Sequence, residues 1–272
     1  MILPSTVSPS ATNYINDRLA AAAGDADIRI LFAVESGSRA WGFPSADSDY
    51  DVRFVYAHRT DRYLSVADLR DVIETPPVDD AILGVPFDFN GWDIRKALQL
   101  ALRSNPVLRE WLVSPIRYGE VAAEAADLLH FVDTVADPAA YTYHYDRLAR
   151  GAWEQIAAEA EAVKVKRYCY ALRPVLMLLW LQTRDGLPPM DAASLTSGLD
   201  LTDAVLLAMA DLFARKRTVG EHDLLPRQSV LDDLITAVLA NKPDRPPIRE
   251  VFTGPALAQA DDFFRKVIAV SD

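Results

Sequence analysis

The chain has 272 residues and a formal net charge of −11, with 39 acidic residues against 28 basic ones. This balance argues against a protein that coats nucleic acid through a broad basic surface, although it is compatible with a local basic pocket. Cys169 is the single cysteine, which excludes an internal disulfide and a cysteine-based zinc site. The first residues do not form a leader, and no apolar run approaches the ~20 residues needed to span a bilayer, so we expect a cytoplasmic protein with no membrane contact.

The first part of the chain alternates between helical and strand-like patterns. Apolar spacing predicts a helix over 10–23, and the run 28–34 predicts a buried strand. Further strands are expected over 49–54, 72–75 and 82–90. Pro76-Pro77 should end the second of these, and Gly91-Trp92 should turn the chain after the third. Helices are expected to follow over 94–103 and 107–113.

From about residue 122 the patterns become helical throughout. The expected helices cover 122–134, 139–162, 164–184, 202–215, 229–240 and 256–270. The sequence therefore predicts an α+β protein, with a mixed sheet and helices over 1–118 followed by an all-helical domain over 119–272 that completes a cleft.

Two motifs lie at the ends of neighbouring predicted strands. Gly37 and Ser38 follow the first strand, and such a turn lets backbone N–H groups approach a phosphate closely. Asp49 and Asp51 stand two residues apart at the start of the next strand, so both carboxylates point to one face of the sheet. Paired carboxylates suit Mg²⁺, which binds a few carboxylate oxygens together with substrate phosphates. The arrangement is typical of nucleotidyl transfer.

The same residues resemble a known family. Gly37, Ser38, Asp49 and Asp51 match the G-S…D-x-D motif of the polymerase-β-type nucleotidyltransferase superfamily one by one. The fuller strings E-S-G-S-R-A-W-G-F and S-D-Y-D-V-R-F look like those of a narrower group, the predicted nucleotidyltransferases that include RNA-ligase-associated members. The resemblance implies a polymerase-β-like domain, a nucleoside triphosphate substrate such as ATP, and Mg²⁺ or Mn²⁺ as the metal.

Two metals about 3.5–4 Å apart usually require three carboxylates, so a third acid is expected on a neighbouring strand. Asp88 is the best candidate, because it ends an apolar run and the family's third carboxylate lies on such a later strand. Asp93 competes with it, but helix capping explains that residue without any metal. Asp49, Asp51 and Asp88 are therefore the predicted metal ligands and catalytic residues.

A basic segment is the second informative stretch. No acid lies between Glu161 and Asp185, whereas five bases do. On a helix Lys166, Tyr170 and Arg173 share one face, and a cationic face with a tyrosine can clamp a triphosphate or an RNA phosphate. The alternative is an ordinary solvated face, but the string K-x-K-x-Y-x-Y-x-L-R-P also looks like a second block of the narrower group.

The resemblance also bears on the phosphate contacts. Gly37, Ser38 and Arg39 are expected to bind nucleotide, in addition to the three residues of the basic segment. For Arg39 the sequence leaves two interpretations open, a contact to the triphosphate and an ion pair with Asp47.

The implied function is an enzyme that moves a nucleotide from a nucleoside triphosphate to an acceptor hydroxyl and releases pyrophosphate. An RNA end is the first choice of acceptor, because of the association with RNA ligases. The alternatives are nucleotidylation of a protein side chain, as in toxin-antitoxin systems, and a non-catalytic nucleotide-binding module. The presence of all three acids argues against the last. The sequence does not indicate an oligomeric state.

Overall fold

The computed structural model describes residues 7–68, 70–159, 161–218, 223–247 and 250–271. The chain divides into two compact units. We call them the sheet unit, formed by Thr6–Gly37, Asp49–Ala136 and Ile248–Asp272, and the helical unit, which contains Ser38–Ser48 and Asp137–Pro247. The segment between the first two strands therefore belongs to the helical unit, and the C-terminal segment belongs to the sheet unit.

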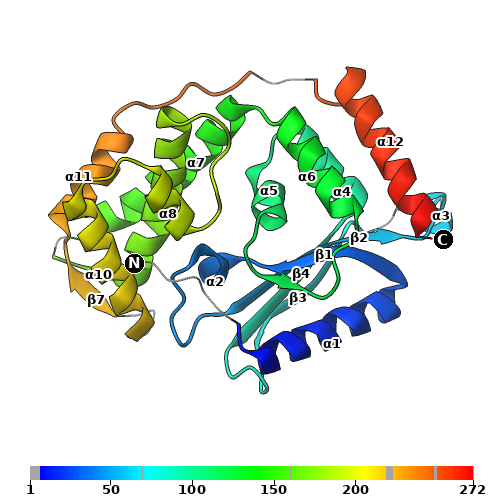
Figure 1. Cartoon of the computed structure of the whole chain (residues 1–272), viewed down its shortest axis with the longest axis horizontal. Helices are drawn as coiled ribbons and strands as arrows, with labels where there is room; N and C mark the ends of the chain where they lie inside the picture. The colour runs from blue at the N-terminus through cyan, green and yellow to red at the C-terminus, as the bar shows by residue number, and fades with distance from the viewer. Residues whose placement is uncertain (1–6, 69, 160, 219–222, 248–249, 272) are drawn as a thin grey trace. The chain divides into compact units, whose positions relative to one another are not determined.

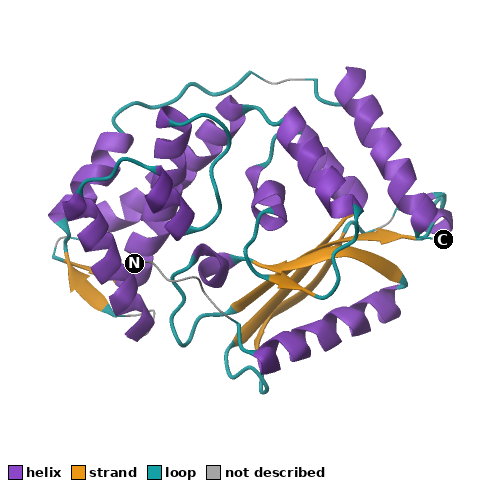
Figure 2. Cartoon of the chain, viewed as in Figure 1, coloured by secondary structure: helices purple, strands orange, loops and turns teal. Residues whose placement is uncertain are grey.

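A mixed sheet, orange in Figure 2, forms the centre of the sheet unit. Its five strands run in the order β3-β4-β2-β1-β5. β1 runs antiparallel to β2 and β5, β3 runs antiparallel to β4, and β2 runs parallel to β4. The strands are β1 (Ile28–Glu35), β2 (Tyr50–His58), β3 (Val72–Asp79), β4 (Pro86–Asp93) and β5 (Arg117–Tyr118). The parallel pair matters for the site, because it brings the beginnings of β2 and β4 to the same edge of the sheet.

Helices cover both faces of this sheet (Figure 1). Helix α1 packs against one face with its apolar side, and α4, α5, α6 and α12 pack against the other. Alternation along β2 supplies both cores, since Val52 and Phe54 face α1 while Val55 faces the opposite helices. The helices of this unit are α1 (Pro9–Ala26), α3 (Thr60–Tyr63), α4 (Ile94–Leu102), α5 (Pro106–Leu112), α6 (Glu124–Val135) and α12 (Gly254–Val270).

The helical unit is built around α8, which packs against α7, α9, α10 and α11. A short antiparallel pair, β6 with β7, joins the segments before α8 and before α11. The elements are α7 (Pro138–Ala157), β6 (Ala162–Lys164), α8 (Val165–Thr183), α9 (Ala192–Gly198), α10 (Asp203–Thr218), β7 (Leu224–Pro226) and α11 (Ser229–Val238). The one-turn helix α2 (Gly37–Trp41) begins after β1, separated from it by Ser36.

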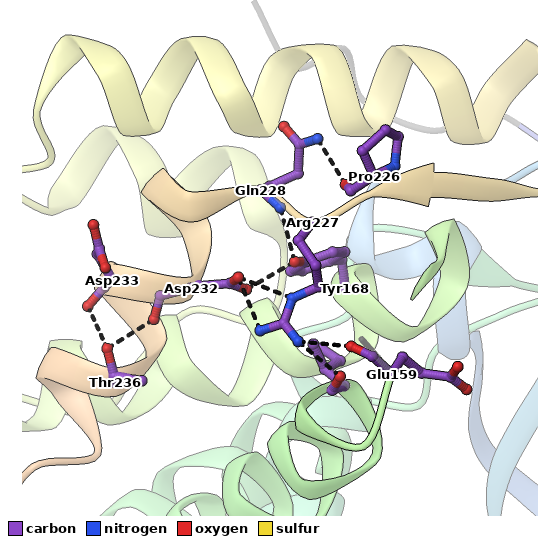
Figure 3. A network of polar contacts seen from close by, with 9 residues as sticks. Glu159, Tyr168, Pro226, Arg227, Gln228, Asp232, Asp233 and Thr236 are labelled. Carbon is purple, nitrogen blue, oxygen red and sulfur yellow. Dashed lines mark hydrogen bonds and ion pairs between the residues drawn. The ribbon is translucent and has the colours of Figure 1, made fainter. Parts of the chain in front are cut away.

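A polar network fixes the start of α8 (Figure 3). The Tyr168 hydroxyl donates to Asp232 Oδ1 at 2.7 Å and accepts from the backbone N–H of Gln228 at 3.0 Å. Arg227 donates to Asp232 Oδ2 and to the backbone carbonyls of Ile156 and Glu159. Three helices are thereby tied together beside the basic segment, so the position of Lys166 on α8 is set by the fold of the unit.

The predicted α+β fold class is confirmed, and the differences from the predicted elements have local causes. β3 continues through Pro76-Pro77 with a shift of register between Thr75 and Val78, which the edge position of the strand tolerates. Gly91 lies inside β4 rather than in a turn, paired with Phe54 of β2. A glycine is needed there because the Phe54 ring occupies the space where a Cβ would stand. The strand pair β6–β7 and helix α9 were not expected.

The compact units also do not follow the predicted boundary at residue 118. Helices α6 and α12 belong to the sheet unit because their apolar sides, including Leu128, Phe131 and Val267, complete the core on one face of the sheet. Within the described part of the chain, no helix combines the length and the apolar character that crossing a membrane requires.

Candidate functional site

Asp51 and Asp88 come together at the start of the parallel strands β2 and β4. The two residues are direct partners in the register of the strands. One nitrogen of Arg53, Nη2, donates to Asp51 Oδ1 at 3.0 Å and to Asp88 Oδ2 at 2.6 Å. Both carboxylates are about one-quarter exposed, whereas the side chain of Arg53 is more buried. The structure therefore gathers two of the three predicted acids around a single cation of the chain itself.

Asp49 lies one residue before β2, on the same side of the chain as Asp51, because the buried Tyr50 separates them. Across the residues that the structure describes, no group of three or more His, Cys, Asp or Glu side chains is arranged to hold a metal ion. The predicted set of three carboxylates is thus not preformed. Its chemistry still fits Mg²⁺ or Mn²⁺, since the donors are hard oxygens and two of them already converge on a positive charge.

Gly37 is the residue that allows the chain to pass this carboxylate pair. Its φ angle is +57°, in the left-handed region that favours glycine. A Cβ built at this position would lie 1.8 Å from Asp51 Oδ2. A glycine is therefore required at position 37 because of the backbone conformation and because of the close approach to Asp51.

The segment Ser38–Ser48 is held by its own polar contacts. The Ser38 hydroxyl donates to the Ser48 hydroxyl at 3.0 Å, and the Ser48 Oγ also accepts from the backbone N–H of Ser45 at 2.9 Å. Arg39 Nη2 donates to the backbone carbonyl of Ser48 at 2.6 Å, which neither interpretation of Arg39 had anticipated. Ser38 is buried. Its predicted contact with a phosphate stays a prediction, as does that of Arg39.

The predicted residues of α8 meet this segment within the helical unit. The Arg173 guanidinium carbon lies 4.2 Å from the centre of the Trp41 ring, and Trp41 contacts Tyr170 edge to face at 5.3 Å. Lys166 Nζ lies 5.4 Å from the centre of the Tyr170 ring. The structure therefore joins Lys166, Tyr170 and Arg173 to the segment Ser38–Ser48 through Trp41, although α8 lies more than 100 positions later in the sequence.

Lys216 is a residue of this cluster that the sequence reasoning missed. Its side chain is completely buried on α10, and Nζ lies 5.2 Å from the Phe43 ring and 6.0 Å from the Tyr170 ring. In the sequence it looks like one of three solvated charges at a helix C-terminus, Arg215-Lys216-Arg217. The available signal was its spacing, since it continues the buried helical stripe of Met209, Leu212 and Phe213.

Asp93, the competing third acid, serves as the N-cap of α4. Its Oδ1 accepts from the backbone N–H of Arg95 at 2.7 Å, and its Oδ2 accepts from the Tyr63 hydroxyl at 2.7 Å. Burial raises the pKa of the Asp93 carboxyl, and the hydrogen bond from Tyr63 opposes that shift. Both oxygens are thus engaged in structural contacts.

A family model matches residues 11–266, and its description is "RNA repair pathway DNA polymerase beta family". The chain belongs to this family. The predicted resemblance to polymerase-β-type nucleotidyltransferases is therefore confirmed, and the match spans all of the predicted site residues.

Two individual proteins were also found to be similar. The uncharacterized protein YcgL of Bacillus subtilis (strain 168) is 41% identical over 208 residues, which cover 76% of this chain and 77% of that protein. A nucleotidyltransferase-like protein of Exiguobacterium sibiricum 255-15, solved at 1.90 Å resolution, aligns with 96% of this chain and 90% of its own, at 10% identity and a TM-score of 0.33. Membership of the family rests on the family model, which matches residues 11–266.

Proposed function

We propose that this protein transfers a nucleoside monophosphate from a nucleoside triphosphate to an acceptor hydroxyl in a reaction that requires Mg²⁺ or Mn²⁺. The observation that carries the proposal is the convergence of Asp51 and Asp88 at the start of two parallel strands, beside Gly37. Membership of a polymerase-beta family supports the same chemistry.

In the proposed reaction the acceptor oxygen forms a bond to the α-phosphorus, and the bond from that phosphorus to the bridging oxygen of the β-phosphate breaks. Pyrophosphate leaves with the electron pair of the broken bond. Asp49, Asp51 and Asp88 would hold the divalent metal, which when bound neutralises the triphosphate and lowers the pKa of the attacking hydroxyl. We assign to Asp88 the additional task of positioning that hydroxyl and receiving its proton.

The phosphate-binding residues in this proposal are Gly37, Ser38, Arg39, Lys166, Tyr170 and Arg173. Nucleotidyl transfer depends chiefly on positioning and charge neutralisation, so cations beside the segment Ser38–Ser48 have a direct use. The contact of Arg173 with Trp41 supports this assignment, because it connects the basic segment to the motif that follows β1.

An RNA end is the acceptor that we favour, because the description of the family refers to an RNA repair pathway. The net charge of −11 favours a short end over a long duplex, since a broad contact with many phosphates would need a basic surface. The same charge is compatible with a protein acceptor, so nucleotidylation of a protein side chain is the second candidate. We infer an enzyme rather than a binding module, because the chain retains all three acids.

The test is to incubate the protein with each of the four α-labelled nucleoside triphosphates, Mg²⁺ or Mn²⁺, and either defined RNA ends or a cell lysate. Label in RNA would support the first acceptor, and label in protein would support the second. Asp51→Asn and chelation by EDTA are the matched controls, and both should abolish the signal. Failure of the wild-type protein to label any acceptor or to release pyrophosphate would overturn the proposal.

A further inference from the structure

Glu35 is a completely buried carboxylate at the end of β1, next to the proposed metal ligand Asp51. Burying a carboxylate is costly unless its oxygens accept hydrogen bonds. Both oxygens of Glu35 do so, since Oε1 accepts from the backbone N–H of Asp51 at 2.9 Å and Oε2 accepts from the Tyr118 hydroxyl at 2.6 Å. Tyr118 is itself buried on β5, so the carboxylate links three strands.

Ser36 and Gly37, the two residues after Glu35, contact the backbone carbonyl and the carboxylate of Asp51. The backbone N–H of Ser36 donates to the Asp51 carbonyl at 2.8 Å. Gly37 lies against the Asp51 carboxylate so closely that no side chain fits there. Both backbone polar groups of Asp51 are therefore engaged by the Glu35-Ser36 pair, which fixes the direction in which the Asp51 side chain leaves the strand.

The acceptor of the Asp51 backbone N–H is a side-chain carboxylate. Glu35 pairs with Val52 in the antiparallel ladder, so its side chain reaches one position along β2 to the neighbouring residue. Here the hydrogen bond falls on the residue that carries the proposed metal-binding carboxylate. A merely structural contact would not need to fall on Asp51.

We propose that Glu35 is a positioning residue that holds Asp51 in the geometry required for metal binding, with Tyr118 orienting the Glu35 carboxylate. The inference rests on the proposed function, because it gives Glu35 a task only if Asp51 binds the metal. Glu35 touches neither the metal nor the substrate in this proposal. It acts through the backbone of Asp51.

The experiment compares Glu35→Leu, which keeps the approximate volume and removes both acceptors, with Glu35→Gln, whose amide oxygen can still accept from Asp51. The readouts are the thermal midpoint and the Mn²⁺ dissociation constant, measured by calorimetry or by electron paramagnetic resonance of the free ion. Glu35→Leu should weaken Mn²⁺ binding by roughly tenfold, the equivalent of one lost buried hydrogen bond. Glu35→Gln should restore the affinity to within about threefold of wild type.

Ser114→Ala is the matched control, because the Ser114 hydroxyl donates to the backbone carbonyl of Glu35 at 2.6 Å without touching Asp51. It should lower the thermal midpoint and leave Mn²⁺ affinity unchanged. Tyr118→Phe is the second variant if Glu35→Leu does not fold, and it should weaken Mn²⁺ binding in the same direction. Unchanged affinity in a folded Glu35→Leu, or in Tyr118→Phe where Glu35→Leu does not fold, would overturn this inference alone. A wild-type protein that binds no Mn²⁺ through Asp51 would overturn the metal-dependent function as well.

Discussion

The Arg53 side chain extends from β2 to Asp88 on β4, where Nη2 donates to Oδ2 at 2.6 Å. The residue that pairs with Arg53 in the parallel register is Asn90, two positions further along β4. The same nitrogen contacts Asp51, and Nη1 donates to the backbone carbonyl of Asp88 at 3.2 Å. The single positive charge of the guanidinium thus reduces the repulsion between the two carboxylates. A divalent cation bound to the same oxygens would compete with this positive charge.

Replacing Arg53 should separate metal affinity from catalysis. In Arg53→Gln the loss of a positive charge beside Asp51 and Asp88 should tighten Mn²⁺ binding. Loss of the guanidinium hydrogen bonds that orient the two carboxylates should slow transfer. Calorimetry and pyrophosphate release measure the two effects. Arg29→Gln, which removes an ion pair with Glu124 elsewhere in the sheet unit, is the control and should change neither. Weaker Mn²⁺ binding in Arg53→Gln would show that the orientation of the carboxylates by Arg53 matters more for metal affinity than the repulsion between Arg53 and the metal ion.

Replacing Asp88 should impair transfer, whereas replacing Asp93 should impair stability. Asp88→Asn should reduce transfer by about 10²-fold or more, the cost of removing one group that stabilises developing charge, and should leave nucleotide binding and the fold mostly intact. Asp93→Ala should lower the free energy of unfolding by about 1–2 kcal/mol through the lost N-cap, with transfer retained below the melting temperature. Active Asp88→Asn together with inactive, folded Asp93→Ala would reverse the assignment.

Gly37 and Gly119 offer a matched pair of glycines in the sheet unit. Their φ angles are +57° and +60°, but a Cβ at Gly37 would meet Asp51 Oδ2 at 1.8 Å, whereas one at Gly119 would come no closer than 3.9 Å to Asn16. Gly119→Ala should therefore cost about 1–2 kcal/mol of backbone strain and leave activity unchanged. Gly37→Ala should also displace the Asp51 carboxylate and abolish transfer. Full activity in Gly37→Ala would contradict the proposed role of Asp51.

Lys166 and Arg173 should contribute to nucleotide binding. A charge-assisted contact with phosphate is worth about 1.5–3 kcal/mol, so Lys166→Ala should raise the dissociation constant of the nucleoside triphosphate by roughly ten- to a hundredfold. Arg173→Ala should do the same and also lower the thermal midpoint, because its buried side chain packs on Trp41. The control is Arg167→Ala on the same helix, since Arg167 is paired with Glu159.

Calorimetry can also separate two uses of this helix. Unchanged nucleotide affinity with impaired use of the acceptor would place Lys166 and Arg173 at the acceptor instead. Unchanged affinity and unchanged transfer in both variants would remove the proposed role in phosphate binding from Lys166 and Arg173.

His58 should make the protein sensitive to mild acid. Burial lowers the pKa of this imidazole below its usual value, so the unfolded chain binds a proton that the folded chain does not. Stability should therefore be constant above the unfolded pKa of about 6.5 and should decrease as the pH falls from there toward the folded pKa. Urea titrations between pH 5 and pH 8 measure this dependence. His58→Gln should flatten it, and an unchanged slope in that variant would assign the effect to another group.

The sequence alone was sufficient for features that depend on neighbouring residues. Four features follow from local periodicity and backbone preference: the strand over 28–34, the turn at Gly37, the alternation of Asp49 and Asp51 about Tyr50, and the N-cap at Asp93. The family resemblance rests on the same segments, because its motifs are short and contiguous.

Only the tertiary structure decided which distant residues meet. The parallel register of β2 with β4 places Asp88 opposite Asp51 and within reach of Arg53, and no local pattern encodes that register. The burial of Lys216 beside Phe43 depends on how α10 packs. Helices α6 and α12 were expected in a helical domain, but their apolar sides complete the core on one face of the sheet. Propensity acts over a few residues, whereas burial is decided by which apolar surfaces find one another across the whole chain.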